Sequence, residues 1–274
     1  MKKQYILMGA TIVVFAALFA SCSQENNMDE AFSQSEKEII FDLGISQTRT
    51  VTIDKKTSFG DGDHVGIYGL KRGATEILHD NLDYHYTADN GKWVAEYSIT
   101  FPIDGSELNF YAYYPYNADL EGTSFDFSVS QDQSKDGYNQ SDLLLAKNEI
   151  ASVDDESITL SFVHKLALVE AEVILPEGEV IKNVDICAKR TATVNLTEQT
   201  AIVKASEAAE YITMQPVEGN VFRAVVPAQS MSKGKVFRIT AEDGAIYWYK
   251  TTESMELVEN KISAFSIDCT GSSL

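Results

Sequence analysis

Apolar and polar side chains alternate with a period of two along most of this chain. In residues 39–45 the apolar side chains of Ile39, Phe41, Leu43 and Ile45 share one face. Such alternation is typical of a β-strand with one buried face. Comparable runs recur at intervals of roughly 8–12 residues, which indicates an all-β sandwich. These runs include Val51–Ile53, Val65–Tyr68, Tyr84–Thr87, Trp93–Phe101, Leu108–Tyr114, Phe125–Val129 and Leu143–Leu145.

Asp-Gly and Asn-Gly pairs separate several of these runs. Such pairs adopt the positive φ angles that tight hairpin turns need. We predict two hairpins: Trp93–Phe101 with Leu108–Tyr114 through Asp104-Gly105, and Val236–Thr240 with Ile246–Tyr249 through Asp243-Gly244. No long stretch has helical periodicity, and one short helix is predicted at Ala205–Tyr211.

A change of phase near the middle of the chain suggests two domains. Apolar residues occupy even positions from Ile158 to Leu168 and odd positions from Val169 to Leu175. A bulge could move the buried face in this way, and so could a strand that leaves one core and enters another. A polar segment, residues 148–157, comes just before this change. We therefore place the domain boundary near residue 157, so that each half has the size of one sandwich domain.

The N-terminus has the pattern of an export signal. Lys2 and Lys3 precede an apolar run that is too short for a membrane span, and small residues then lead to Cys22. Residues 1–21 are therefore predicted to be a lipoprotein signal peptide, because the segment resembles a bacterial lipobox in which the cysteine thiol takes the lipid. An ordinary secretory signal with a chance cysteine is the alternative. The polar residues 23–38 are expected to form a flexible tether.

The net charge of the chain argues against some classes of binding partner. The 274 residues include 41 acidic and 22 basic side chains, which gives a net charge of −19. A chain this acidic is repelled by phosphate backbones, which argues against nucleic-acid binding. Cys187 and Cys269 could form a disulfide in an oxidising compartment. Strand alternation places Cys187 opposite its apolar neighbours, however, so we favour free thiols.

The sequence contains no recognisable catalytic or metal motif. G-x-S-x-G, H-E-x-x-H and Walker patterns are absent, and the four histidines are not spaced as metal ligands. Asp61-Gly62-Asp63-His64 is better explained as a turn than as a calcium loop. His164 lies on an apolar face and is expected to be a core residue. We therefore expect no enzyme activity, no cofactor and no metal.

Several segments together resemble the fimbrillin family, the Mfa-like subunits of type V pili in anaerobic Gram-negative bacteria. The resemblance rests on the order and spacing of the motifs along the chain, and each motif alone is weak. The motifs are the lipobox, EIIFDLGI at 38–45, SQTRT at 46–50, FGDGDHVGIYG at 59–69, NFYAYYPYN at 109–117, DLLLAKN at 142–148 and LSFVHKLALVEAEV at 160–173.

The resemblance implies a structure and a mode of assembly. It implies two transthyretin-like Greek-key β-sandwich domains in tandem, over residues 50–156 and 157–274, after a tether and removable strand at 22–49. Such proteins are exported to the outer membrane and anchored there by lipid, here on Cys22. In polymerising members an arginine-specific protease cuts near the N-terminus, and the matching position here is Arg49, before Thr50. A strand from another pilus subunit then fills the groove that the first strand has left.

Elementary energetics agree with this mode of assembly. Burying the four apolar side chains of strand 39–45 is worth roughly 6–12 kcal/mol before ordering costs. Removing the strand would expose an apolar groove and unpaired strand edges, which favour pairing with another strand. The expected function is a non-enzymatic structural or adhesive pilus subunit. Its expected partners are other pilus subunits through strand exchange, the outer membrane through lipid on Cys22, and a host or bacterial surface ligand.

Three alternatives stay open at the level of sequence. Strand 39–45 could be a permanent edge strand, with Arg49 in a solvated loop. The chain could be a surface glycan-binding lipoprotein that does not polymerise, with an aromatic platform around Tyr111, Tyr113, Tyr114 and Tyr116 or at the two tryptophans. A surface hydrolase is the least favoured alternative, because the nucleophile and metal motifs are missing.

Overall fold

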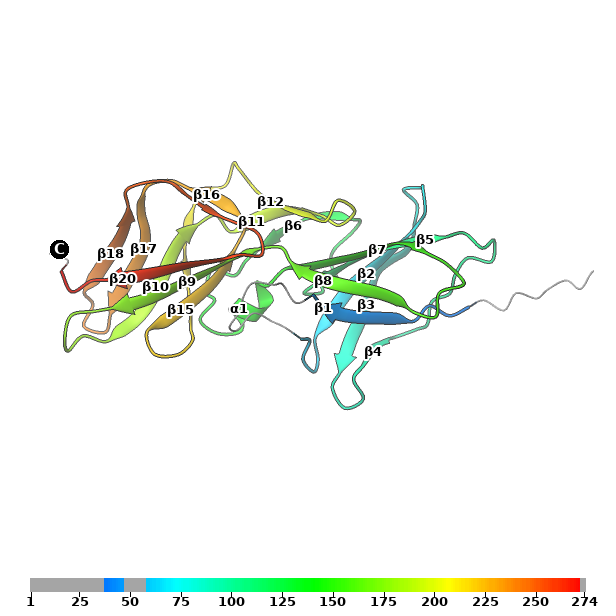
Figure 1. Ribbon diagram of the computed structural model, residues 1–274, viewed down its shortest axis with the longest axis horizontal. Helices are drawn as coiled ribbons and strands as arrows, with labels where there is room; N and C mark the ends of the chain where they lie inside the picture. The colour runs from blue at the N-terminus through cyan, green and yellow to red at the C-terminus, as the bar shows by residue number, and fades with distance from the viewer. Residues whose placement is uncertain (1–36, 47–57, 272–274) are drawn as a thin grey trace, which may run out of the picture. The chain divides into compact units, whose positions relative to one another are not determined.

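The structure is a computed structural model that describes residues 37–46 and 58–271 (Figure 1). Within this part of the chain, 20 strands and one four-residue helix, α1 (Gly137–Gln140), are present. The predicted all-β sandwich fold is confirmed. Residues Glu36–Leu274 make one compact unit by their contacts. No helix in the described part combines the length and apolarity that a membrane span requires.

The first sheet has seven strands in the order β1-β8-β7-β5-β2-β3-β4. β1 pairs with β8 in parallel, and every other neighbouring pair is antiparallel. The strands are β1 (Phe41–Ile45), β8 (Ile158–His164), β7 (Leu144–Ala151), β5 (Leu108–Tyr114), β2 (His64–Lys71), β3 (Ile77–Thr87) and β4 (Lys92–Ala95).

The two faces of this sheet bury different cores. One face carries Val65, Ile67, Phe110 and Phe162 into a cluster that also includes Leu43 of β1. The opposite face buries a second set of side chains, among them Tyr68, Tyr111 and Tyr113, in the cluster that forms the core of the C-terminal half. The near-continuous apolar run of β5 follows from this, because both of its faces are covered.

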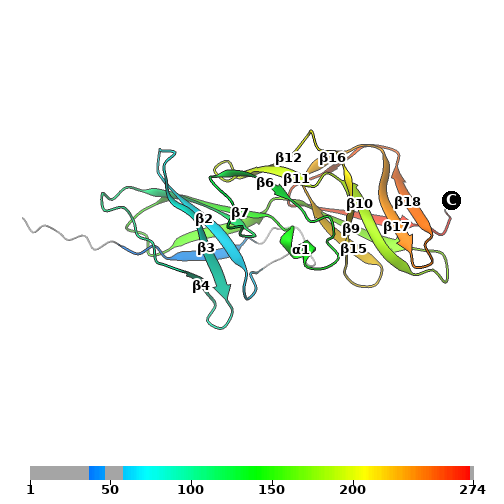
Figure 2. The ribbon, with the colours of Figure 1, turned by 180° about the vertical axis from the view of Figure 1, so that it is seen from behind.

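The rest of the chain forms four smaller sheets (Figure 2). Their orders are β13-β10-β17-β18, β14-β15-β9-β20, β12-β11-β6 and β16-β19. The strands are β6 (Ser124–Ser128), β9 (Ala167–Ile174), β10 (Ile181–Ala188), β11 (Thr191–Asn195), β12 (Thr200–Val203), β13 (Glu210–Thr213), β14 (Gln215–Pro216), β15 (Val221–Val226), β16 (Gln229–Met231), β17 (Gly234–Ala241), β18 (Ile246–Thr251), β19 (Met255–Leu257) and β20 (Ile262–Asp268).

The change of phase after Leu168 follows the passage of the chain from one core to the other, between β8 and β9. β8 pairs in the seven-stranded sheet, whereas β9 pairs with β15 and β20. The strand therefore leaves one core and enters another, and a bulge is not the cause. β6 comes before β7 in sequence but pairs with β11 of the C-terminal half. The domain boundary at residue 157 stays a prediction.

Two local predictions are wrong and one is confirmed. The hairpin of Trp93–Phe101 with Leu108–Tyr114 does not form, because β4 ends at Ala95 and pairs with β3, while β5 pairs with β2 and β7. The predicted helix at Ala205–Tyr211 is replaced by a turn that leads into β13. The hairpin through Asp243-Gly244 is confirmed as β17–β18.

Candidate functional site

Strand β1 lies at one edge of the seven-stranded sheet and is held there by backbone hydrogen bonds to β8. Its register is parallel, with Phe41 opposite Ile158 and Ile45 opposite Phe162. The Ile158 N–H donates to the Ile40 carbonyl at 2.7 Å, and the Ser46 N–H donates to the Phe162 carbonyl at 2.8 Å. The pairing therefore extends over the whole strand.

The residues just before β1 pair on the opposite side. The Ile39 N–H donates to the Ile99 carbonyl at 2.9 Å, and the Phe101 N–H donates to the Lys37 carbonyl at 3.1 Å. The Lys37 ammonium also donates to the Val153 and Asp155 carbonyls, both at 2.7 Å. Segment 37–46 thus fills a seam between β8 and the stretch that follows β4.

The side chains of this segment alternate as the sequence predicts. Ile39 and Leu43 are buried, at 5% and 8% exposure, whereas Ile40 on the other face is 57% exposed. Phe41 and Ile45 are half-buried against the same core. Burying a side chain of this size is worth about 1.5–3 kcal/mol, so Ile39 and Leu43 together provide about 3–6 kcal/mol.

Aromatic rings form the floor beneath the segment. The Phe41 ring makes edge-to-face contacts with Tyr84 and Phe110, at centroid distances of 5.2 and 5.0 Å. Phe59 makes similar contacts with Trp93 at 4.8 Å and with Phe162 at 5.3 Å. Sequence reasoning did not find this floor, because its members come from β3, β4, β5 and β8. Without segment 37–46, part of this aromatic surface would face water.

The pKa of the Tyr84 hydroxyl reflects its burial beneath segment 37–46. Loss of solvent raises its pKa to about 12, and the negative charge of Glu38 acts in the same direction. Tyr84 is therefore neutral throughout the physiological range and contributes to the groove as a ring with a neutral hydroxyl.

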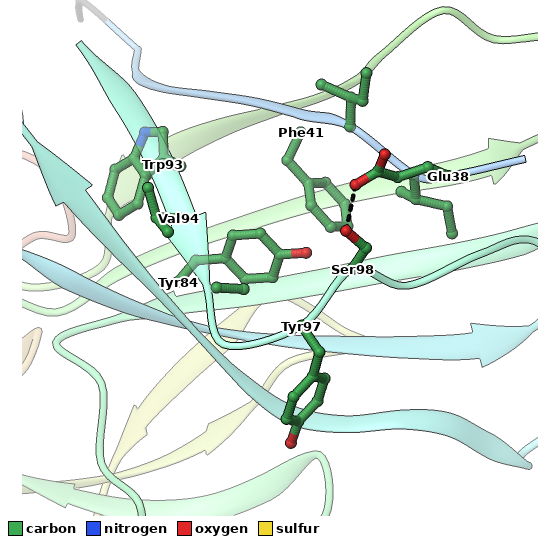
Figure 3. A pocket seen from close by; sticks show the side chains of 10 residues that line it. Glu38, Phe41, Tyr84, Trp93, Val94, Tyr97 and Ser98 are labelled. Atoms are coloured by element: carbon green, nitrogen blue, oxygen red, sulfur yellow. Dashed lines mark hydrogen bonds between the residues drawn. The ribbon is translucent and has the colours of Figure 1, made fainter. Parts of the chain in front are cut away.

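A cavity of about 250 Å³ lies beside the segment (Figure 3). Phe41 and Tyr84 project into it, and the Ser98 hydroxyl donates to the Glu38 carboxylate at its rim. Val94 and Tyr97, which also line it, are 39% and 64% exposed. Ile39, Ile40 and Ala95 add apolar surface to the lining, so the cavity suits apolar packing and strand pairing.

The structure places the predicted site residues in two groups. Ile39, Phe41, Leu43 and Ile45 come together on the inner face of segment 37–46. Cys22, the predicted lipidation site, and Arg49 and Thr50, the predicted cleavage site, lie outside the described residues. In sequence, Arg49 follows Ser46 after two residues, so a cut there separates the whole of β1 from β2.

Most of the aromatic side chains considered for a glycan-binding platform are buried or covered in the structure. Tyr111, Tyr113 and Tyr114 are buried, at 1–6% exposure. The ring of Trp248 lies under the Lys235 ammonium, 3.8 Å from the centroid, and makes an angle of 55° with the Tyr211 ring. These five rings are buried, covered or inclined to one another, so they do not combine into one flat surface for sugar stacking.

The remaining candidates are structural. His164 is a core residue, as expected, but its Nδ1 lies 2.9 Å from the Asp142 carboxylate, a side-chain partner that the sequence did not indicate. Asp61 and Gly62 form a turn that leads into β2. Cys187 and Cys269 are free thiols. Among the described residues, no three His, Cys, Asp or Glu side chains are arranged to hold a metal ion.

Known proteins resemble this chain over most of its length. A sequence profile of the family described as "Fimbrillin-like" matches residues 48–273. The chain is 30% identical over 208 residues to the "Putative fimbrium subunit Fim1C" of Bacteroides uniformis, which covers 73% of this chain and 64% of that protein. It is 27% identical over 191 residues to the "Putative fimbrium tip subunit Fim1C" of Bacteroides ovatus, which covers 61% and 35% respectively.

A solved structure shares the fold. The crystal structure of "a putative cell adhesion protein" from Bacteroides ovatus superposes with a TM-score of 0.64 at 18% identity, over 86% of this chain and 93% of that one. The chain spans less than two thirds of the length of either curated relative that it matches.

Proposed function

The chain belongs to the fimbrillin-like family, and we propose that it is a non-enzymatic structural or adhesive subunit of a type V pilus. In this proposal it is exported as a lipoprotein with lipid on Cys22 and stands at the outer membrane or in the fimbrium. Cleavage between Arg49 and Thr50 then frees the segment that contains β1. A strand of another subunit takes the place of that segment, which links the subunits into a fibre.

The placement of segment 37–46 carries this proposal. The segment fills an apolar, aromatic-floored groove, and its hydrogen bonds run to β8 on one side and to residues 99–101 on the other. Once it has left, both flanking backbones and the groove floor would be unpaired. An incoming extended strand restores the main-chain hydrogen bonds and the apolar contacts together, which is the basis of β-strand addition.

Whether segment 37–46 stays in its groove depends on its covalent link to the rest of the chain. Within one chain, the segment is always next to its groove, and its effective concentration there is high. A free peptide must instead overcome an association cost of about 4–15 kcal/mol, which is comparable with what its buried side chains return. A single backbone cut therefore suffices to make the segment exchangeable.

The same cut would release the body from lipidated Cys22. A cut subunit would then be held at the surface by neighbouring subunits, whereas an uncut copy would keep its own lipid anchor. The ratio of cut to uncut copies would thus set how many subunits are attached directly to the membrane.

Limited digestion of the purified precursor with an arginine-specific protease tests the proposal. The chain contains five arginines, of which Arg72 is an exposed competitor in the turn between β2 and β3. We expect one dominant cut, after Arg49, followed by loss of the N-terminal fragment that contains segment 37–46 and by a ladder of oligomers. Mass spectrometry and size-exclusion chromatography measure these events.

Two variants provide the controls. Arg49→Lys should block both the cut and the ladder, while Arg72→Lys should leave both unchanged. If the protein is cut after Arg49 and yet stays monomeric with the peptide bound, strand exchange is wrong. If Arg49 resists the protease while Arg72 is cut, the proposed maturation site is wrong.

A further inference from the structure

Two histidines that are distant in sequence stand side by side on the first sheet. β2 and β3 pair in a register that places His64 directly opposite His85. Their ring centroids are 5.5 Å apart, and the ring planes differ by 30°. Sequence spacing gave no sign of this pair, because it depends on the register of two strands.

The pair faces away from the groove core. The neighbouring cross-strand pair, Val65 with Tyr84, is buried in that core, and side chains alternate along a strand. His64 and His85 therefore lie on the other face, where the His64 side chain is 45% exposed. His85 is half-buried, so the pair is open to solvent on the side of His64.

A carboxylate fixes one of the two rings. Asp83 lies on the same face as His85, and its Oδ1 is 2.8 Å from His64 Nδ1. The Tyr116 ring stacks on His64 at 6.4 Å, and the Tyr116 N–H donates to the His64 carbonyl at 3.1 Å. With Nδ1 engaged by the carboxylate, Nε2 is the nitrogen left to present a lone pair to a ligand. This carboxylate–histidine arrangement is the usual support of a metal-binding imidazole.

The spacing of the rings suits a shared ion. Metal–nitrogen bonds to imidazole measure about 2.0–2.1 Å, so two imidazoles on one tetrahedral ion stand with ring centres roughly 5–6 Å apart. The net charge of −19 also raises the local concentration of cations around the protein. Imidazole nitrogen favours zinc, copper and nickel over magnesium or calcium.

We propose that His64 and His85 bind a divalent transition-metal ion through their Nε2 atoms, with Asp83 as a positioning residue. The described residues supply no third His, Cys, Asp or Glu ligand around this point. Water or a group from another molecule completes the coordination. The site is independent of strand exchange, because its side chains lie on the face of the sheet that points away from the groove core.

Equilibrium dialysis of the uncut, full-length protein against Zn²⁺ tests the site. We expect one ion per chain above a background that the double variant His64→Gln/His85→Gln defines. Either single variant should weaken that binding at least tenfold. Asp83→Asn should weaken it by about 10–100-fold, which is typical when a partner of a metal-bound imidazole is lost. His79→Gln removes a histidine elsewhere on β3 and should bind as the parent does.

Copper supplies an independent readout of the ligands. The electron paramagnetic resonance spectrum of the Cu²⁺-loaded protein should show coupling to two imidazole nitrogens, and each single variant should reduce this to one. Circular dichroism confirms that each variant is folded. Equal Zn²⁺ binding by the parent and the double variant would overturn the site. Unchanged affinity in Asp83→Asn would overturn the positioning role of Asp83.

Discussion

Strands β1 and β20 occupy matching positions in the two halves of the protein. Each is the edge strand of its sheet, and each runs parallel to its neighbour, β1 to β8 and β20 to β9. Each also carries a phenylalanine with two edge-to-face contacts. Phe41 meets Tyr84 and Phe110, and Phe265 meets Phe237 and Tyr249, at centroid distances of 5.0–6.2 Å. In both halves, therefore, a parallel edge strand packs against the core through one phenylalanine ring.

The difference between them lies in how each is connected. β20 pairs with β9 through seven residues, and β1 pairs with β8 through five, supplemented by the hydrogen bonds of residues 37–39. β1 thus has fewer paired residues than β20, but it buries Leu43 and its pairing is extended by residues 37–39. The distinguishing feature is the arginine-containing sequence that follows β1. Weak packing is thus not what would make β1 removable, and a cut in the backbone is required.

The largest expected effects come from truncating a core residue in each strand. Leu43→Ala and Ile267→Ala should each lower the free energy of unfolding by about 2–5 kcal/mol in the uncut protein, because both side chains are buried. Urea denaturation measures this. After the cut at Arg49 and removal of the peptide, Leu43→Ala should match the parent, while Ile267→Ala should keep its full cost.

Ile40→Ala is the matched control for this pair. Ile40 belongs to the same segment but is 57% exposed, so its truncation should change stability by less than about 0.5 kcal/mol. A Leu43→Ala effect as small as that of Ile40→Ala in the uncut protein would show that β1 is not seated in its groove. β1 and β20 would then not be equivalent in how their side chains are buried.

Aromatic contacts give the next largest effect. Phe41→Leu and Phe265→Leu keep an apolar side chain but remove two ring–ring contacts each, and each contact is worth about 0.5–1.5 kcal/mol beyond burial. Both variants should therefore lose about 1–3 kcal/mol in urea denaturation. A loss confined to Phe265→Leu would mean that the Phe41 ring contributes little to holding β1.

The smallest effect is spectroscopic and concerns Tyr84. Its pKa is raised to about 12 by burial beneath β1. Because the pKa is higher in the folded state, the stability that Tyr84 contributes is present below pH of about 10 and is lost as the pH rises toward 12. In the cut monomer without its peptide, the pKa of Tyr84 should return toward the ordinary value near 10.

The difference in tyrosinate absorbance between the parent and Tyr84→Phe isolates this group among the 13 tyrosines. The titration is made at low protein concentration, so that the groove of the cut protein stays empty. An unchanged midpoint after removal of the peptide would show that β1 does not cover Tyr84.

Local pattern was sufficient for some elements of this fold. Alternation identified β1 and its buried face, and the Asp243-Gly244 turn fixed the β17–β18 hairpin, because register there depends on a few adjacent residues. The alternation in Cys187 and its neighbours likewise placed its side chain opposite the core-facing Val184 and Ile186.

Long-range pairing could not be read in the same way. Residues 96–101 have the composition of a strand, but their hydrogen bonds go to residues 37–39, which lie about sixty positions earlier in the sequence. The groove floor and the His64–His85 pair depend on the same kind of register between distant strands. Alternation identifies which face of a strand is buried, but it does not identify the neighbouring strand.

The direction of β1 sets the order in which it would leave. Ser46, just after its C-terminal end, is nearer to Arg49 in the sequence, whereas residues 37–39 at the other end are bound to residues 99–101. After a cut, fraying would start at Ser46 and progress backwards, with residues 37–39 released last. An arriving strand can therefore advance from the Phe162 end while the departing one still covers the rest. The incoming strand would then replace the departing segment residue by residue. The rate of exchange would depend on the concentration of the incoming strand, and the groove would not be fully empty at any stage.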